Sequence, residues 1–255
     1  MKKRILPEGR EAMEKVVEGG RNLYGQAIGI IMLETVFPRI PGEMGNATTW
    51  DFPVEYRIVK GASPQRVVRE ADSRLLEPFV EVAKDLERMG VRAITTNCGF
   101  LIIFQKEIAD AVDIPVFTSS LMQVPLVYQM LKSDQKVGII AVDSRSLTQK
   151  HLMAARADSI PTVIVGTEDE EEFTNVMIGN IPRLDIEKAR AELVKTAKKL
   201  ISEHPEVGAI VLECTNMPPY ARAIQKEVNL PVFDMITLTN MVYEVVVRKE
   251  YVGFM

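Results

Sequence analysis

The chain alternates short apolar runs with longer segments in which apolar residues recur at helical spacing. Residues 28–33 (IGIIML) and 137–142 (VGIIAV) are continuous apolar runs rich in β-branched residues. Such runs are typical of strands buried on both faces of a parallel sheet. The spacing predicts helices over 65–90, with Gly90 as the C-terminal cap, and over 184–208. Strands and helices that alternate in this way imply right-handed crossovers and a parallel sheet.

Three segments of the first half resemble three segments of the second half in the same order. The pairs are 91–98 with 207–214, 113–120 with 229–236, and 28–35 with 137–144. The offset is 116 residues for the first two pairs and 109 for the third. Three matches in the same order indicate two copies of one structural unit. We predict an α/β fold of two pseudo-symmetric, doubly wound parallel-sheet lobes, with the site in the cleft between them.

The repeat also sets the expected domain boundaries. Residues 27–125 together with 236–255 form the first α/β lobe, and residues 126–235 form the second. Residues 1–26 lie outside both copies as an N-terminal extension, which is either an oligomerisation arm or decoration.

Composition narrows the class of protein. The 255 residues are 47% apolar and 26% charged, as in ordinary globular proteins. A net charge of −4 without a block of like charges predicts neither a nucleic acid nor a membrane as partner. The chain shows no signal-peptide pattern and no apolar run of spanning length. We therefore expect a cytoplasmic protein whose two cysteines are reduced thiols.

Cys98 and Cys214 occupy equivalent positions of the repeat, each directly after a predicted strand. Ligands of open parallel sheets bind at this end of the strands. A lone free cysteine usually packs as a small hydrophobe, but the matched placement of both favours chemistry. Each thiol precedes a helix start, whose N–H groups favour a thiolate or a bound carboxylate. Two thiols facing each other could remove a proton from one face of a carbon and return one to the other.

Other kinds of site find less support. The sequence has no glycine-rich nucleotide motif, no CxxC pair and no metal cluster, so we expect no cofactor and no metal. His151 and His204 are predicted to be solvated surface residues. Ser119 follows a strand without a nucleophile-elbow motif, which disfavours a serine hydrolase. It remains a candidate contact for a substrate.

The two cysteine motifs, TTNCGF (95–100) and LECTNMPP (212–219), resemble the aspartate/glutamate racemase superfamily, which includes hydantoin racemases, maleate isomerases and arylmalonate decarboxylases. The resemblance extends from about Gln26 to the C-terminus. It implies a cofactor-independent homodimer in which Cys98 and Cys214 are the two bases. It also implies that their neighbours hold the carboxylate and amino groups of the substrate. These neighbours are Asn97, Gly99, Thr215 and Asn216.

The chain departs from the glutamate racemase pattern near both cysteines. Apolar Met32 and Leu33 replace the Asp-Ser pair after the first strand, and Phe100 and Asn216 replace a threonine and a histidine. Glu213 stands where a small residue normally precedes the second cysteine. These changes favour a substrate that is less polar than glutamate or differently arranged.

Residues 34–57 are expected to form a long connection without a clear copy in the second half. Long connections in compact domains are usually functional. Arg39, held between prolines, is either a bidentate ligand of a substrate carboxylate or an ordinary exposed arginine. Trp50 and Phe52 either close the cleft or contact a second subunit.

The sequence thus favours a cofactor-independent, two-base racemase or epimerase of a small carboxylate such as an amino acid. A decarboxylase or cis–trans isomerase of the same superfamily, or a hydantoin racemase, is the alternative. In decarboxylation or isomerisation one cysteine suffices. A ligand-binding protein without catalysis is a third interpretation, disfavoured because binding alone needs no paired thiols.

Overall fold

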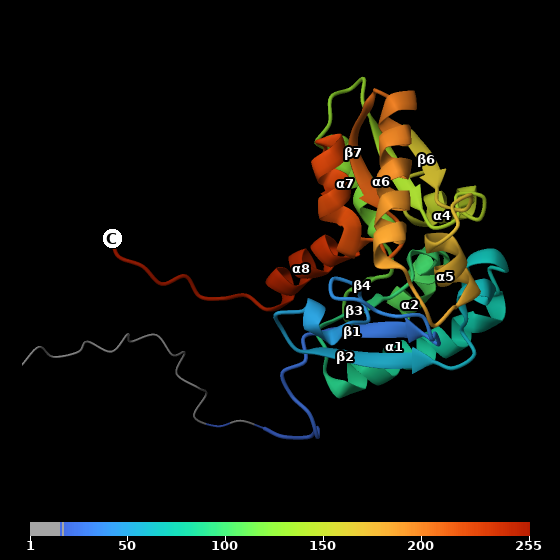
Figure 1. Ribbon diagram of the computed structural model, residues 1–255. Helices are drawn as coiled ribbons and strands as arrows, with labels where there is room; N and C mark the ends of the chain where they lie inside the picture. Colours follow the sequence, from blue (N-terminus) through green and yellow to red (C-terminus); the bar gives the residue numbers. More distant parts are fainter. Residues whose placement is uncertain (1–15, 17) are drawn as a thin grey trace, which may run out of the picture.

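Two four-stranded parallel sheets form the two halves of the protein (Figure 1). The computed structural model describes residue 16 and residues 18–255, so residues 1–15 and 17 of the expected N-terminal extension lie outside the described residues. The strand orders are β2-β1-β3-β4 and β6-β5-β7-β8. The strands are β1 (Ile28–Leu33), β2 (Val54–Val59), β3 (Ala93–Thr96), β4 (Val116–Phe117), β5 (Lys136–Ala141), β6 (Thr162–Gly166), β7 (Val207–Leu212) and β8 (Val232–Phe233). Identical orders in the two halves confirm the predicted fold of two α/β lobes.

The central strands of both sheets are apolar because both of their faces are covered. Every residue of β1 and of β7 is buried. In the first sheet β1 pairs with β3 up to Ile31 and Thr96, and in the second β5 pairs with β7 up to Ile140 and Leu212. The residues that follow β3 and β7 therefore leave the two sheets at equivalent points.

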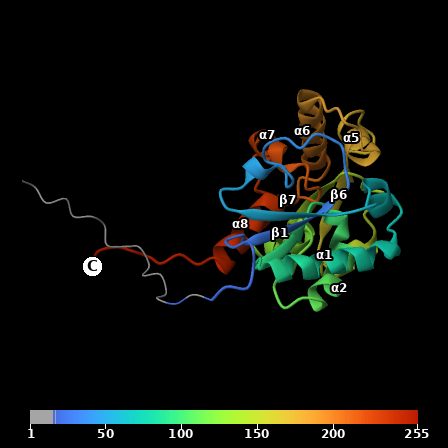
Figure 2. The same cartoon turned by 90° about the horizontal axis from the view of Figure 1, so that it is seen from below.

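Helices cover both faces of the first sheet (Figure 2). The helices are α1 (Leu76–Met89), α2 (Gln105–Asp110), α3 (Val124–Gln129), α4 (Gln149–Ala154), α5 (Phe173–Gly179), α6 (Ile186–Glu203), α7 (Ala221–Val228) and α8 (Met235–Val246). Helix α1 packs against one face of the first sheet, where its Phe79 joins Ile31 and Ile94 in the larger core. Helix α8 covers the opposite face, where Met235 joins Ile28. Among the described residues, no helix is both long enough and apolar enough to cross a membrane.

The segment predicted as one helix over 65–90 is divided. A π-turn at Gln65–Arg69 and a short 3-10 turn at Ser73–Leu75 precede α1. Ala71 between them has a φ of 44°, which a helix cannot contain. The side chain of Asp72 accepts a hydrogen bond from the N–H of Arg74 and caps the second turn. Gly90 ends α1 in the left-handed conformation with a φ of 95°, as predicted.

The connection predicted over 34–57 is shorter than expected, because its last residues belong to the edge strand β2. Trp50 and Phe52 are buried in the core of the first lobe. Phe52 stacks on Tyr243 of α8, with ring centres 3.7 Å apart. Both residues thus pack within the first lobe, where Phe52 joins the C-terminal helix to the first sheet, and neither closes the cleft. Their contact with a second subunit stays a prediction.

Candidate active site

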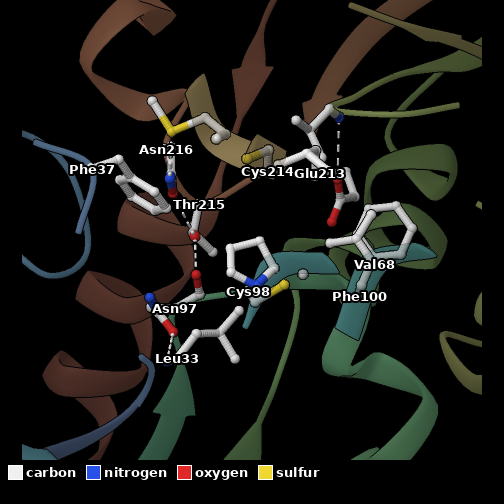
Figure 3. A pocket seen from close by; sticks show the side chains of 15 residues that line it. Leu33, Phe37, Val68, Asn97, Cys98, Phe100, Glu213, Cys214, Thr215 and Asn216 are labelled. Atoms are coloured by element: carbon white, nitrogen blue, oxygen red, sulfur yellow. Dashed lines mark hydrogen bonds between the residues drawn. The ribbon is translucent and has the colours of Figure 1, made fainter. Parts of the chain in front are cut away.

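A pocket lies where the two lobes meet, at the carboxyl ends of their strands (Figure 3). Both cysteines line it: Cys98 follows β3 of the first lobe and Cys214 follows β7 of the second, each after one intervening residue. Most of the other walls are apolar. The first half contributes Leu33, Phe37, Pro64, Val68, Asn97, Gly99 and Phe100, and the second contributes Val142, Met177, Ile178, Glu213, Thr215 and Asn216.

Asn97 and Glu213, which precede the two cysteines, have equivalent positions in the two lobes. The N–H of Asn97 donates to the carbonyl of Ile31, and that of Glu213 to the carbonyl of Ile140. The Asn97 Oδ1 then accepts a hydrogen bond of 2.8 Å from the N–H of Leu33. The Glu213 Oε2 accepts a longer one, 3.5 Å, from the N–H of Val142. Each side chain ties the end of its cysteine strand to the neighbouring central strand.

The two lobes are also joined directly beside the thiols. The Thr215 hydroxyl donates to the carbonyl oxygen of Asn97. The Ser120 hydroxyl donates to the carbonyl oxygen of Leu212 over 2.6 Å. Within the second lobe, the Asn216 side-chain amide contacts the sulfur of Met177 at 3.2 Å. Because these groups are buried, the hydrogen bonds fix the position of the cysteines relative to each other.

Gly99 is required by the close approach of the second lobe. A Cβ at this position would lie 2.3 Å from the Glu213 Oε1 and 2.4 Å from the backbone oxygen of the same residue. A side chain can rotate away, but the backbone oxygen belongs to the turn that carries Cys214. Glycine is therefore the residue that lets the two cysteine segments meet.

We expect Gly99→Ala to separate the two lobes locally and to lower the free energy of unfolding by about 1 to 3 kcal/mol. Urea denaturation measures this change. Gly179→Ala is the matched control, because its Cβ would meet only side-chain atoms of Ile181, the nearest at 3.4 Å. The close-approach argument fails if both alanine variants unfold at the same urea concentration as the unsubstituted protein.

Burial governs the acidity of the site. It raises the pKa of Cys98 to about 12 and that of Cys214 well above the ordinary range, and the neighbouring Glu213 raises both further. Hydrogen bonds from the backbone N–H groups of Phe100 and Leu101 oppose the shift at Cys98. Burial also raises the pKa of Glu213 to about 8. At neutral pH the empty pocket therefore holds two neutral thiols and a carboxyl group that is mostly protonated.

The structure brings most of the predicted site residues together, because Asn97, Gly99, Thr215 and Asn216 all line the pocket with the two cysteines. Ser119 does not line it. Its hydroxyl accepts a hydrogen bond from the N–H of Leu121 and caps the short turn Ser120–Gln123.

Arg39 does not line the pocket either. It pairs with the buried carboxylate of Glu43 and donates to the Thr35 hydroxyl over 2.7 Å. Its guanidinium carbon lies 4.7 Å from the ring centre of Phe37, so it contacts the pocket through this lining residue. Its positive charge opposes the rise in the pKa of Cys98.

Sequence reasoning missed the apolar walls of the pocket and the acid in them. Three of the apolar lining residues come from separate segments of the chain: Phe37, Val68 and Met177. No sequence motif indicates that these segments lie together. Glu213 was noticed only as a departure from the racemase pattern. The repeat could have revealed it, because the offset of 116 residues places it opposite Asn97. Among residues 16 and 18–255, no group of three His, Cys, Asp or Glu side chains is placed to hold a metal ion.

The surface position predicted for His151 is wrong. Its side chain is buried, and its ring meets the ring of Phe100 edge-on with centres 5.0 Å apart. Burial lowers the pKa of this imidazole. His151 thus supports one wall of the pocket from behind, as a neutral aromatic ring.

Comparison with known proteins identifies the family. The profile of the Asp/Glu/Hydantoin racemase family matches residues 58–240. Over 222 residues the chain is 32% identical to a dimethylsulfoniopropionate lyase of Durusdinium sp. clade D, covering 84% of this chain and 73% of that protein. Over 224 residues it is 30% identical to dimethylsulfoniopropionate lyase 7 of Emiliania huxleyi (strain CCMP1516), covering 84% and 65%. The chain belongs to the Asp/Glu/Hydantoin racemase family, as the cysteine motifs predicted.

Solved structures share the fold at lower identity. Unliganded arylmalonate decarboxylase superposes with a TM-score of 0.56 at 12% identity, covering 88% of this chain and 94% of that one. Allantoin racemase from Pseudomonas fluorescens gives 0.58 at 14%, covering 87% and 91%. The aspartate racemase of Picrophilus torridus gives 0.53 at 17%, covering 87% and 94%. One two-lobed scaffold therefore carries enzymes named for decarboxylation and for racemisation.

Proposed function

We propose that this protein is a lyase that eliminates a sulfonium group from the β-carbon of a small carboxylate such as dimethylsulfoniopropionate. The named lyases at 30% and 32% identity support the substrate. A base removes a proton from the α-carbon, and the electron pair of that bond forms the double bond between the α- and β-carbons. The β-carbon–sulfur bond breaks, and dimethyl sulfide leaves with its electrons. Acrylate is the second product, and the proton passes from the base to solvent.

One observation carries the choice of a sulfonium over an amino acid: apart from the carboxyl group of Glu213, the pocket offers few free acceptors for N–H donors. The Asn97 oxygen accepts from the N–H of Leu33, and the Thr215 hydroxyl donates to a backbone carbonyl. An ammonium group brings three N–H donors, and a buried donor without an acceptor is costly. A sulfonium has no N–H to satisfy, and apolar and aromatic surface is favourable for its methyl groups. Phe37 and Phe100 supply such surface.

Cys98 is the stronger candidate for the base. Two backbone N–H groups, of Phe100 and Leu101, favour its thiolate, whereas one from Asn216 favours that of Cys214. The thiol is neutral in the empty pocket, and a positive charge on the bound substrate lowers its pKa. The substrate therefore helps to create the base that attacks it. Because dimethyl sulfide leaves as a neutral molecule, this reaction needs no acid and a single thiol suffices.

Racemisation or epimerisation of a small carboxylate is the second candidate. The presence of both thiols at equivalent positions of one pocket favours it, because inversion needs a base on one face of the carbon and an acid on the other. We also propose that the protein is a cytoplasmic homodimer, as expected from the sequence.

Proton NMR in D2O separates the two reactions. We expect the methylene signals of dimethylsulfoniopropionate to be replaced by the vinyl signals of acrylate, while the Cα signals of L- and D-amino acids and hydantoins persist. Enzyme with both cysteines replaced by alanine is the control. Loss of an amino-acid or hydantoin Cα signal without sulfonium cleavage would instead establish the racemase, and no change in any substrate would favour a binding protein.

A further inference from the structure

Glu213 is an ionisable side chain buried in the wall of the pocket. Only 1% of the residue is exposed to solvent. Its Oε1 has no hydrogen-bond partner among the described residues, and its Oε2 has only the long contact with Val142. Figure 3 shows the carboxyl group extending from the second lobe toward the side chains of Val68 and Phe100. Buried polar atoms without partners are rare and call for an explanation.

The fold itself does not require an acid at this position. In the first lobe the equivalent residue, Asn97, makes the same tie with a neutral amide and a shorter hydrogen bond. An amide at position 213 would offer the same acceptor oxygen without the cost of burying a charge. The hydrogen bond to the neighbouring strand therefore does not explain why position 213 carries a carboxyl group rather than an amide.

The part of the chain that the structure describes also supplies no counter-charge for a Glu213 carboxylate. No lysine, arginine or histidine belongs to the residues that line the pocket. The groups that act on its neighbours are the two cysteines and the Arg39–Glu43 pair, whose charges compensate each other. An unpaired buried carboxylate is strongly unfavourable. A partner for it has to enter with the ligand.

We infer that the carboxylate of Glu213 pairs with the positive centre of the substrate and so makes the pocket specific for zwitterions that carry a sulfonium or quaternary ammonium group. Phe100 and Val68 adjoin the carboxyl group and provide apolar and aromatic surface for the methyl groups of such a cation. This inference rests on the proposed function and deepens it. The reacting base remains a cysteine, and Glu213 determines which substrates place their α-carbon beside it.

Binding of a cation should then release a proton. Because the pKa of Glu213 is raised to about 8, the carboxyl group of the empty pocket is mostly protonated at pH 7. Pairing with a cation favours the ionised form, so that binding of a cation at pH 7 releases most of one proton. Affinity for the cation accordingly rises with pH and levels off above about pH 8. A ligand of the same shape with an uncharged carbon in place of the positive centre releases no proton from Glu213.

Two ligands that differ only in the central charge test this directly. They are 3-(trimethylammonio)propionate and 4,4-dimethylpentanoate, in which a carbon replaces the nitrogen. Isothermal titration calorimetry from pH 6 to 9, in buffers of different ionisation enthalpy, measures both affinity and proton release. The variant is Glu213→Gln. The control is Asp234→Asn, the same change at another buried carboxyl, which caps α8 and does not line the pocket.

At pH 8 we expect unsubstituted protein and Asp234→Asn to bind 3-(trimethylammonio)propionate at least about tenfold more tightly than 4,4-dimethylpentanoate, and Glu213→Gln to lose this preference. Preference retained in Glu213→Gln, absence of proton release, or no binding of the cation by the unsubstituted protein would each overturn the inference. Cleavage of dimethylsulfoniopropionate is scored separately. If the protein cleaves dimethylsulfoniopropionate but its preference for the positively charged ligand does not depend on Glu213, only this inference is wrong. If the preference depends on Glu213 but the protein does not cleave dimethylsulfoniopropionate, only the proposed reaction is wrong.

Discussion

Replacing Cys98 with alanine is expected to lower kcat for elimination from dimethylsulfoniopropionate by at least about a hundredfold, because a positioned general base typically contributes that factor or more. Replacing Cys214 is expected to cost less than about tenfold. The asymmetry follows from the environments of the thiols, since two backbone N–H groups face Cys98 and one faces Cys214. Initial rates of acrylate formation, at substrate concentrations well above KM, give both numbers.

The pair of variants also discriminates between the reactions. A racemase uses one thiol as base and the other as acid, so that both alanine variants would lose inversion to a similar extent. Each variant must first show the thermal transition of the unsubstituted protein, because both thiols are buried and alanine leaves a small void. Full elimination activity in Cys98→Ala would show that this thiol is not the base. Full activity in both variants would show that neither cysteine is needed for catalysis.

The architecture was predictable from the sequence because it is recorded in the order of apolar segments. The repeats at Cys98 and Cys214 gave the two lobes, the parallel sheets and the meeting of the thiols. A constant offset is a property of the backbone and survives changes of side chain. The edge strand β2 escaped prediction because its residues are mostly half-buried and lack the continuous apolar run of β1.

The partners of individual side chains were not predictable in this way. Arg39 has the chemistry to bind a carboxylate, but the carboxylate it meets is that of Glu43, four residues further along the chain. His151 is buried through its contact with Phe100, which lies 51 residues away in sequence. Such pairings depend on how separate segments pack, and no local spacing encodes them.

Glu213→Gln is expected to stabilise the protein, and to do so increasingly as the pH rises. Below the ordinary glutamate pKa of 4.5, Glu213 is protonated in both the folded and the unfolded chain and costs nothing. Between pH 4.5 and about 8 the unfolded chain releases this proton while the folded chain retains it, so that stability falls with pH. Above about pH 8 both states are ionised and the penalty is constant. Glutamine avoids the penalty and keeps the acceptor that faces Val142.

The stabilisation of Glu213→Gln relative to the unsubstituted protein should be small at pH 5 and reach about 2 to 4 kcal/mol at pH 8. Urea denaturation at both pH values measures it, and pH 8 lies below the ordinary pKa of 9.0 at which the raised pKa values of the two thiols begin to matter. Other buried carboxyls, such as Asp234, are common to both proteins and cancel. A variant that is less stable at pH 8 would mean that the carboxyl group supports the fold. A variant that gains stability while losing its preference for a cation would show that the acid is retained for binding at a cost to folding.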